Sequence, residues 1–169
     1  MGLWAAFACC LSSCGYHALY GEATATRISV AAGQVLTPDT NAEQAALSGA
    51  RAELAAAGRL ASGDDFPRLT IDLLRVDEAS RGIHVRTRQP AASGMGVAVV
   101  LRGRLVLASD QEPSVDTGDV RRALQTSGDA DPRRDATVYD QAVRSAAERA
   151  GRAVARLAQG IPEPNDDAP

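Results

Sequence analysis

Apolar residues recur along this chain with two different periods, and the order of those periods limits the folds open to it. Segments 41–57 and 136–159 repeat them every three or four residues, which predicts two helices with one apolar face each. Shorter segments alternate apolar and polar residues, as half-buried strands do. The predicted strands are 27–30, 68–76, 83–88 and 97–108, with 120–126 as a further candidate.

The ends of the predicted helices carry residues typical of helix starts and stops. Thr40-Asn41-Ala42-Glu43 has the form of a capping box, which would begin the first helix. Gly58 is placed to end it, and Gly160 with Pro162 to end the second. Gly103 interrupts the strand at 97–108, so we expect a bulge or kink there. The apolar row of that strand is Val97, Val99, Leu101, Leu105 and Leu107.

The core is rich in alanine, and aromatic residues make up only 4% of the chain. Because alanine buries little area, we expect the helices to lie close to a sheet. The sequence therefore predicts an α+β fold, a two-layer sandwich with two long helices packed on one face of a mostly antiparallel sheet of about four strands. One domain would span 26–161, with loops at 89–96 and within 110–135, and a disordered tail at 162–169.

The N-terminus carries the sharpest motif. Leu3 to Leu11 is an uncharged apolar run, too short to cross a bilayer but suited to an export signal. Leu11-Ser12-Ser13-Cys14-Gly15 then resembles a bacterial lipobox. That resemblance implies a signal peptide at 1–13, a covalent S-diacylglycerol and an N-acyl chain such as palmitate on Cys14, and a lipidated tether at 14–25.

One feature of this segment departs from the lipoprotein pattern. No Lys or Arg lies between Met1 and the apolar run, although export signals normally begin with positive charge. The alternative is a buried N-terminal helix with an incidental cysteine. By resemblance to Gram-negative lipoproteins, Gly15 rather than Asp after Cys14 permits sorting to the outer membrane.

Candidates for catalysis are few. All three cysteines lie in the first 14 residues, and neither His17 nor His84 has a ligand-like spacing to another donor. All 18 basic residues are arginine, so a phosphate-binding loop that needs lysine is excluded. A net charge of −3 gives no reason to expect a nucleic-acid partner. We expect no enzyme activity and no cofactor other than the lipid on Cys14.

One cluster of arginines suggests a binding surface. Arg86 and Arg88 share a face of one predicted strand, beside His84, while Arg102 and Arg104 share a face of the next. If these strands pair as a hairpin, the four arginines form a patch able to contact the phosphates of an anionic lipid. The alternative is an ordinary charged, solvent-facing side of the sheet.

The chain resembles one known family. Leu11 to Gly21, with Cys14-Gly15-Tyr16 at its centre, looks like the start of LptE-type lipopolysaccharide (LPS)-assembly lipoproteins, and Tyr139 to Arg149 is similar to that family's final helix. The segment 110–135 departs from the family pattern. The resemblance implies an outer-membrane, lipid-anchored protein on the periplasmic side, which assists assembly of the LPS-export β-barrel LptD and delivery of lipopolysaccharide to the outer leaflet.

Two other classes of function stay open at this point. One is an accessory interaction lipoprotein of another envelope transport complex, and the other is a small periplasmic hydrolase. The resemblance implies a β-barrel translocon as partner, with lipopolysaccharide as a ligand to be tested. It maps no lipopolysaccharide-contacting residue by motif.

Overall fold

The computed structural model describes residues 26–80, 83–86, 89–92, 95–109, 111–126 and 132–162. Several sequence predictions therefore lie outside the described residues. They are the signal peptide at 1–13, the lipid attachment at Cys14, the tether at 14–25, the side chain of Arg88 and most of the predicted tail at 162–169.

Six strands and two helices make up the described chain. In order they are β1 (Ser29–Val35), α1 (Thr40–Ala56), β2 (Arg68–Ser80), β3 (Ile83–Arg86), β4 (Gln89–Ala92), β5 (Met95–Val106), β6 (Val115–Thr126) and α2 (Pro132–Ala158).

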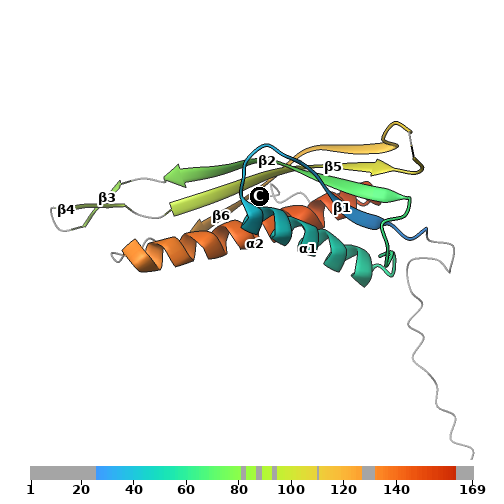
Figure 1. Ribbon diagram of the computed structural model, residues 1–169. Helices are drawn as coiled ribbons and strands as arrows, with labels where there is room; N and C mark the ends of the chain where they lie inside the picture. Colours follow the sequence, from blue (N-terminus) through green and yellow to red (C-terminus); the bar gives the residue numbers. More distant parts are fainter. Residues whose placement is uncertain are drawn as a thin grey trace, which may run out of the picture.

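Four strands form one mixed sheet in the order β1-β2-β5-β6. β1 runs parallel to β2 because α1 returns the chain between them, and the other two pairings are antiparallel. Both helices pack on one face of this sheet (Figure 1). The predicted two-layer α+β sandwich, with two helices on a mostly antiparallel sheet of four strands, is confirmed.

The sequence prediction was wrong at one loop and several boundaries. Residues 89–92, expected within a loop, form β4, which pairs antiparallel with β3. The helix expected from 136 begins at Pro132, and the strand candidate at 120–126 begins at Val115. The two strand errors have the same cause: a paired neighbour extends a segment whose own sequence is too polar or too small to indicate its structure.

The start of α1 also differs from the prediction. Asp39, not Thr40, is the N-cap: its backbone is extended, and its carboxylate accepts a 2.9 Å hydrogen bond from the Ala42 N–H. The predicted capping box at Thr40 was therefore displaced by one residue. Gly58 (φ +67°) and Gly160 (φ +75°) follow the helices with left-handed backbone, as predicted.

The core is thin because helices and sheet approach closely. Seven alanines of α2 and four of α1 are buried, and they face a sheet row that includes Leu69, Leu73, Val99 and Leu101. A Cβ added to Gly103 would lie 2.3 Å from the Val154 Cγ1, so α2 rests almost on the β5 backbone. The register of β5 against β6 shifts at this glycine, as the predicted irregularity required, but the extra residue lies on β6: two steps from Arg102 to Arg104 oppose three from Asp119 to Asp116. Leu107, predicted in the apolar row, is instead 51% exposed.

The two helices contact each other through their backbones. A Cβ added to Gly49 would lie 2.1 Å from the Glu148 carbonyl oxygen, and one added to Gly151 would lie 2.0 Å from the Ala46 carbonyl oxygen. An ion pair between Arg156 Nε and Glu53 Oε1, 2.6 Å apart, links the helices further along. No helix in the described part of the chain is long and apolar enough to span a bilayer.

This contact predicts the effect of a single methyl group. Gly151→Ala should lower the free energy of unfolding by about 1–3 kcal/mol, because the helices must separate to admit it. Gly63→Ala is the control, since the nearest atom to its Cβ would be 3.6 Å away. Urea denaturation of both variants measures the difference, and equal stability of the two would contradict this packing.

Candidate functional site

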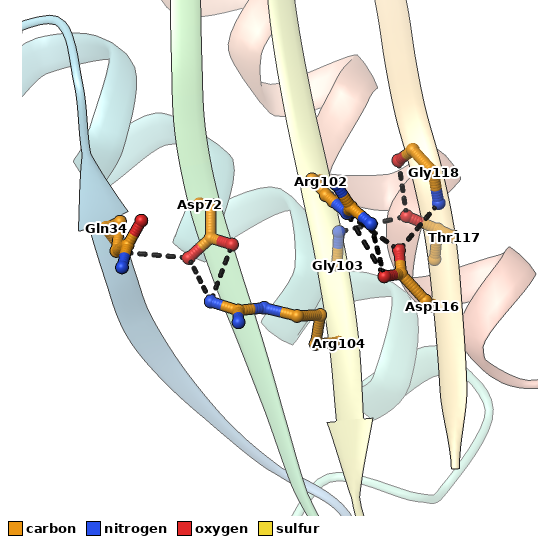
Figure 2. A network of polar contacts seen from close by, with 8 residues as sticks. All are labelled: Gln34, Asp72, Arg102, Gly103, Arg104, Asp116, Thr117 and Gly118. Carbon is orange, nitrogen blue, oxygen red and sulfur yellow. Dashed lines mark hydrogen bonds and ion pairs between the residues drawn. The ribbon is translucent and has the colours of Figure 1, made fainter. Parts of the chain in front are cut away.

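The helices leave the other face of the sheet uncovered, and two ion pairs lie there (Figure 1, Figure 2). Alternation along the strands places Asp72 of β2 and Asp116 of β6 on this face, opposite the apolar rows that meet the helices. Arg102 and Arg104 share this face of β5, as the sequence predicted. Each of these two arginines forms an ion pair with a carboxylate from a neighbouring strand.

Asp72 on β2 joins three strands. Its Oδ1 accepts a 2.7 Å hydrogen bond from the Gln34 N–H, and its Oδ2 lies 2.8 Å from Arg104 Nη2 (Figure 2). The register of β1 against β2 is interrupted between Ala32 and Val35, so this carboxylate supplies an acceptor where the ladder is irregular. Asp72 is only 4% exposed, so the loss of one of its hydrogen bonds costs more free energy of folding than the same loss at a surface carboxylate.

Gly33 makes room for that carboxylate. A Cβ at this position would lie 2.0 Å from the Asp72 Oδ1 and 2.7 Å from Thr70 Cγ2. Any larger residue would push Asp72 away from Gln34 and Arg104. The short edge strand β1 is therefore tied to the sheet by a polar side chain as well as by its ladder.

Arg102 and Asp116 form the second pair, between β5 and β6. Arg102 Nε donates to both Asp116 oxygens at 2.9 and 3.1 Å, and Nη2 donates to Oδ2 at 2.6 Å. This forked geometry and a further hydrogen bond from the Gly118 N–H lower the pKa of Asp116 to about 2. The same contact raises the pKa of Arg102.

The backbone of β6 just after Asp116 contains a β-bulge, which spans Thr117 and Gly118. Thr117 Oγ1 accepts a 2.9 Å hydrogen bond from the Gly103 N–H, and Gly118 has a φ of +66°. This bulge in β6 lies opposite Gly103, and it brings the Asp116 side chain to Arg102, although the Cα partner of Arg102 in the ladder is Asp119. Local backbone geometry, rather than sequence spacing, decides this pairing.

The structure does not pair the strand of Arg86 with the strand of Arg102 and Arg104, and Arg88 lies outside the described residues. β5 pairs with β2 on one side and β6 on the other, so it has no free edge for the strand that carries Arg86. That strand, β3, pairs with β4 instead. The hairpin assumed for the patch was therefore wrong. Gln89, the partner of Arg86, is thirteen residues from Arg102, roughly 40 Å in extended chain.

Sequence reasoning missed the two carboxylates that pair with Arg102 and Arg104. Asp72 stood in a predicted strand at a polar position, but its partner depends on the register with β5. Asp116 stood in a segment with no clear pattern. Anion binding at Arg102 or Arg104 would have to compete with Asp116 or Asp72, and phosphate contact stays a prediction.

Other titratable groups are scattered over the described residues. The pKa of Tyr139 on α2 is raised, first by burial and then by the neighbouring Glu78 of β2. Within these residues, no three side chains of His, Cys, Asp or Glu gather as metal ligands would. A shallow pocket of about 200 Å³ lies beside β1 and α1, and Val30, Arg51 and Leu60 contribute to its lining.

Comparison with known proteins shows similarity at the level of fold. No family model matches the chain, and no curated protein matches its sequence. A crystal structure of a candidate lipoprotein from Caulobacter crescentus CB15 superposes with a TM-score of 0.50 and 14% identity, covering 80% of this chain and 93% of that one. A minor lipoprotein from Acinetobacter baumannii gives 0.46 and 9%, covering 80% and 94%.

The shared fold with the Caulobacter protein covers most of both chains. That protein is described as a candidate lipoprotein. At this identity the similarity concerns the fold alone.

The Asp72 contacts predict a stability difference between two aspartates of β2. Asp72→Ala should cost about 1–3 kcal/mol, because the Gln34 N–H loses its acceptor and Arg104 loses its counter-charge. Asp77→Ala should stay within about 0.5 kcal/mol, since its pair with Arg75 is exposed. Chemical denaturation of both variants tests this, and equal losses would refute the role of Asp72.

The Asp116 contact predicts a pH dependence. Its folded pKa of about 2 lies below the ordinary value of 3.8, so its stabilisation is complete above pH 4 and is lost as the pH falls through 2. In a carboxyl NMR titration, Arg102→Gln should move the midpoint back toward 3.8, because the forked hydrogen bond is the largest cause of the shift. A midpoint unaffected by Arg102→Gln would show that the pair does not form in solution.

Proposed function

We propose that this protein is an outer-membrane lipoprotein that assists assembly of the lipopolysaccharide-export β-barrel and delivery of lipopolysaccharide to the outer leaflet. It acts by binding rather than by catalysis. The observation that carries this proposal is the combination of the lipobox-like Leu11 to Cys14 with a sandwich whose fold a candidate lipoprotein shares.

The physical chemistry of the anchor supports a membrane-held protein. A single acyl chain binds a bilayer only marginally, whereas the two or three chains expected on Cys14 hold it stably. A short tether then keeps the domain at a high effective concentration near other proteins of that membrane. Binding to a neighbouring barrel would therefore need only modest intrinsic affinity.

The uncovered sheet face supports a barrel as the partner. The interior of a transmembrane β-barrel is polar, so a domain seated there needs a polar surface that keeps its shape. The paired residues Asp72 with Arg104 and Arg102 with Asp116 form such a surface. The resemblance to LptE-type proteins suggests an LptD-like barrel, and the proposal includes lipopolysaccharide as a ligand to be tested.

A first experiment tests the anchor. Cys14→Ala should abolish incorporation of labelled palmitate and release the protein from the membrane fraction, because no other cysteine follows in the chain. Cys10→Ala is the matched control and should change neither measurement, since it lies in the peptide expected to be removed. Full labelling of the Cys14→Ala protein would end the proposal.

A second experiment identifies the partner. The lipidated protein, captured from detergent-solubilised membranes after cross-linking, should retain a large β-barrel identified by mass spectrometry. Recovery of an inner-membrane transporter instead would favour an accessory lipoprotein of another transport complex.

A further inference from the structure

Four large apolar side chains are more than a third exposed in the described part of the chain, and they fall into two pairs. Val35 and Leu36, which are 40% and 66% exposed, lie where β1 ends. Phe66 and Leu107, which are 40% and 51% exposed, lie at the end of the sheet where β2 begins and β5 finishes. Isolated exposed apolar residues are common, so the position of each pair matters more than its exposure.

Strand register shows that Phe66 and Leu107 belong to one end. Arg68, the first residue of β2, pairs with Val106, the last of β5. Phe66 therefore precedes the paired region by two residues, and Leu107 follows it by one. We call this surface, made of Phe66, Arg68 and Leu107, the apolar end.

Arg68 gives the apolar end a positive charge beside its ring. Its guanidinium carbon lies 4.8 Å from the centroid of the Phe66 ring, a cation–π distance, and its Nη2 donates to the Asp64 carbonyl oxygen. An apolar pair beside an arginine has the composition of a surface that meets lipid headgroups, where rings enter the boundary and cations stay with phosphates.

The chain enters the domain at this same end. Ser29, the first residue of β1, pairs with Arg68, so β1 starts where β2 starts and β5 finishes (Figure 1). Twelve residues join Cys14 to Thr26. A chain of that length spans at most about 40 Å. A lipid on Cys14 therefore keeps this end within reach of the bilayer.

The opposite end is held away from the membrane by the length of the sheet. β2 has 13 residues, which extend about 40 Å, and β3 and β4 lie beyond it (Figure 1). Leu36 occupies an intermediate position, because its N–H bonds to the Leu73 carbonyl and Leu73 pairs with Leu101. Six residues of β5 and its extension, about 20 Å, separate that level from Leu107.

We propose that the apolar end is a membrane-contact surface: Phe66 and Leu107 seat in the headgroup boundary of the bilayer that holds the lipid anchor, with Arg68 at the level of the phosphates. This inference rests on the proposed lipidation of Cys14. It adds an orientation for the anchored protein before it docks to a barrel, in which the sheet stands away from the bilayer and presents its β3–β4 end to the periplasm.

Apolar contact, not net charge, drives this seating. Asp64 and Asp65 lie in the loop just before Phe66, so the charge of Arg68 is locally balanced. Contact should therefore persist on neutral lipid and at high salt, unlike the binding of a basic patch to anionic lipid.

The sequence offers a clean optical probe of this orientation. The only tryptophan is Trp4, within the segment expected to be removed, so each tryptophan introduced into the mature protein is the sole one. Leu107→Trp and Phe66→Trp report on the apolar end, and Leu36→Trp is the matched control on the other exposed pair. The full lipidated protein is reconstituted into phosphatidylcholine vesicles with brominated acyl chains, at low and at high salt.

The inference expects a blue-shifted emission and several-fold stronger bromine quenching for Leu107→Trp and Phe66→Trp than for Leu36→Trp, at both salt concentrations. Circular dichroism melting curves establish that each variant is folded. Equal quenching at all three positions, or stronger quenching of Leu36→Trp, would overturn the orientation.

Two further outcomes separate this inference from the function on which it rests. Protein that floats with the vesicles but shows no quenching at any position keeps its anchor and loses the membrane-contact surface, which would then be free for a protein partner or a second copy. Protein that does not float has no functional anchor, and both proposals fail together.

Discussion

The fold depends on a close approach of backbones that only small residues allow. Gly49 and Gly151 bring α1 and α2 into direct contact, and Gly103 lets α2 settle onto β5. With aromatic residues at 4% of the chain, few aromatic side chains are available to fill the space between layers. Alanines bury little area, so the core depends on dispersion contacts between them and the side chains of the strands. These contacts weaken steeply as the atoms move apart. The three glycines therefore set the spacing on which the whole core relies.

On the uncovered face of the sheet, polar contacts compensate for the low content of aromatic side chains. Where apolar side chains cannot hold the strands together, carboxylates and guanidinium groups do so. Asp72 compensates for the irregular pairing of β1, and the Arg102–Asp116 pair joins β5 to the bulged part of β6. Both pairs leave the surface polar yet ordered. A domain built in this way can present one face to a wet partner while its helices shield the core.

The proposed function depends on the point at which the chain enters the domain. The chain reaches the domain at Ser29, beside Arg68, so a lipid anchor and the exposed Phe66 and Leu107 lie at one end. The β3–β4 hairpin and the start of α2 lie at the other (Figure 1). A tethered domain with two distinct ends can be oriented by the membrane itself, which reduces the freedom lost when it docks to a partner.

By itself, the sequence determined the types of the long elements, the helix stops at Gly58 and Gly160, the irregularity beside Gly103 and the two-layer class, because period, glycine chemistry and alanine content are local properties. It also placed Arg102 and Arg104 on one face. Only the tertiary structure decided that Asp72 and Asp116 neutralise them, that β3 pairs with β4, and that Leu107 is exposed. Those outcomes depend on strand register, which joins residues far apart in the chain and has no local signal.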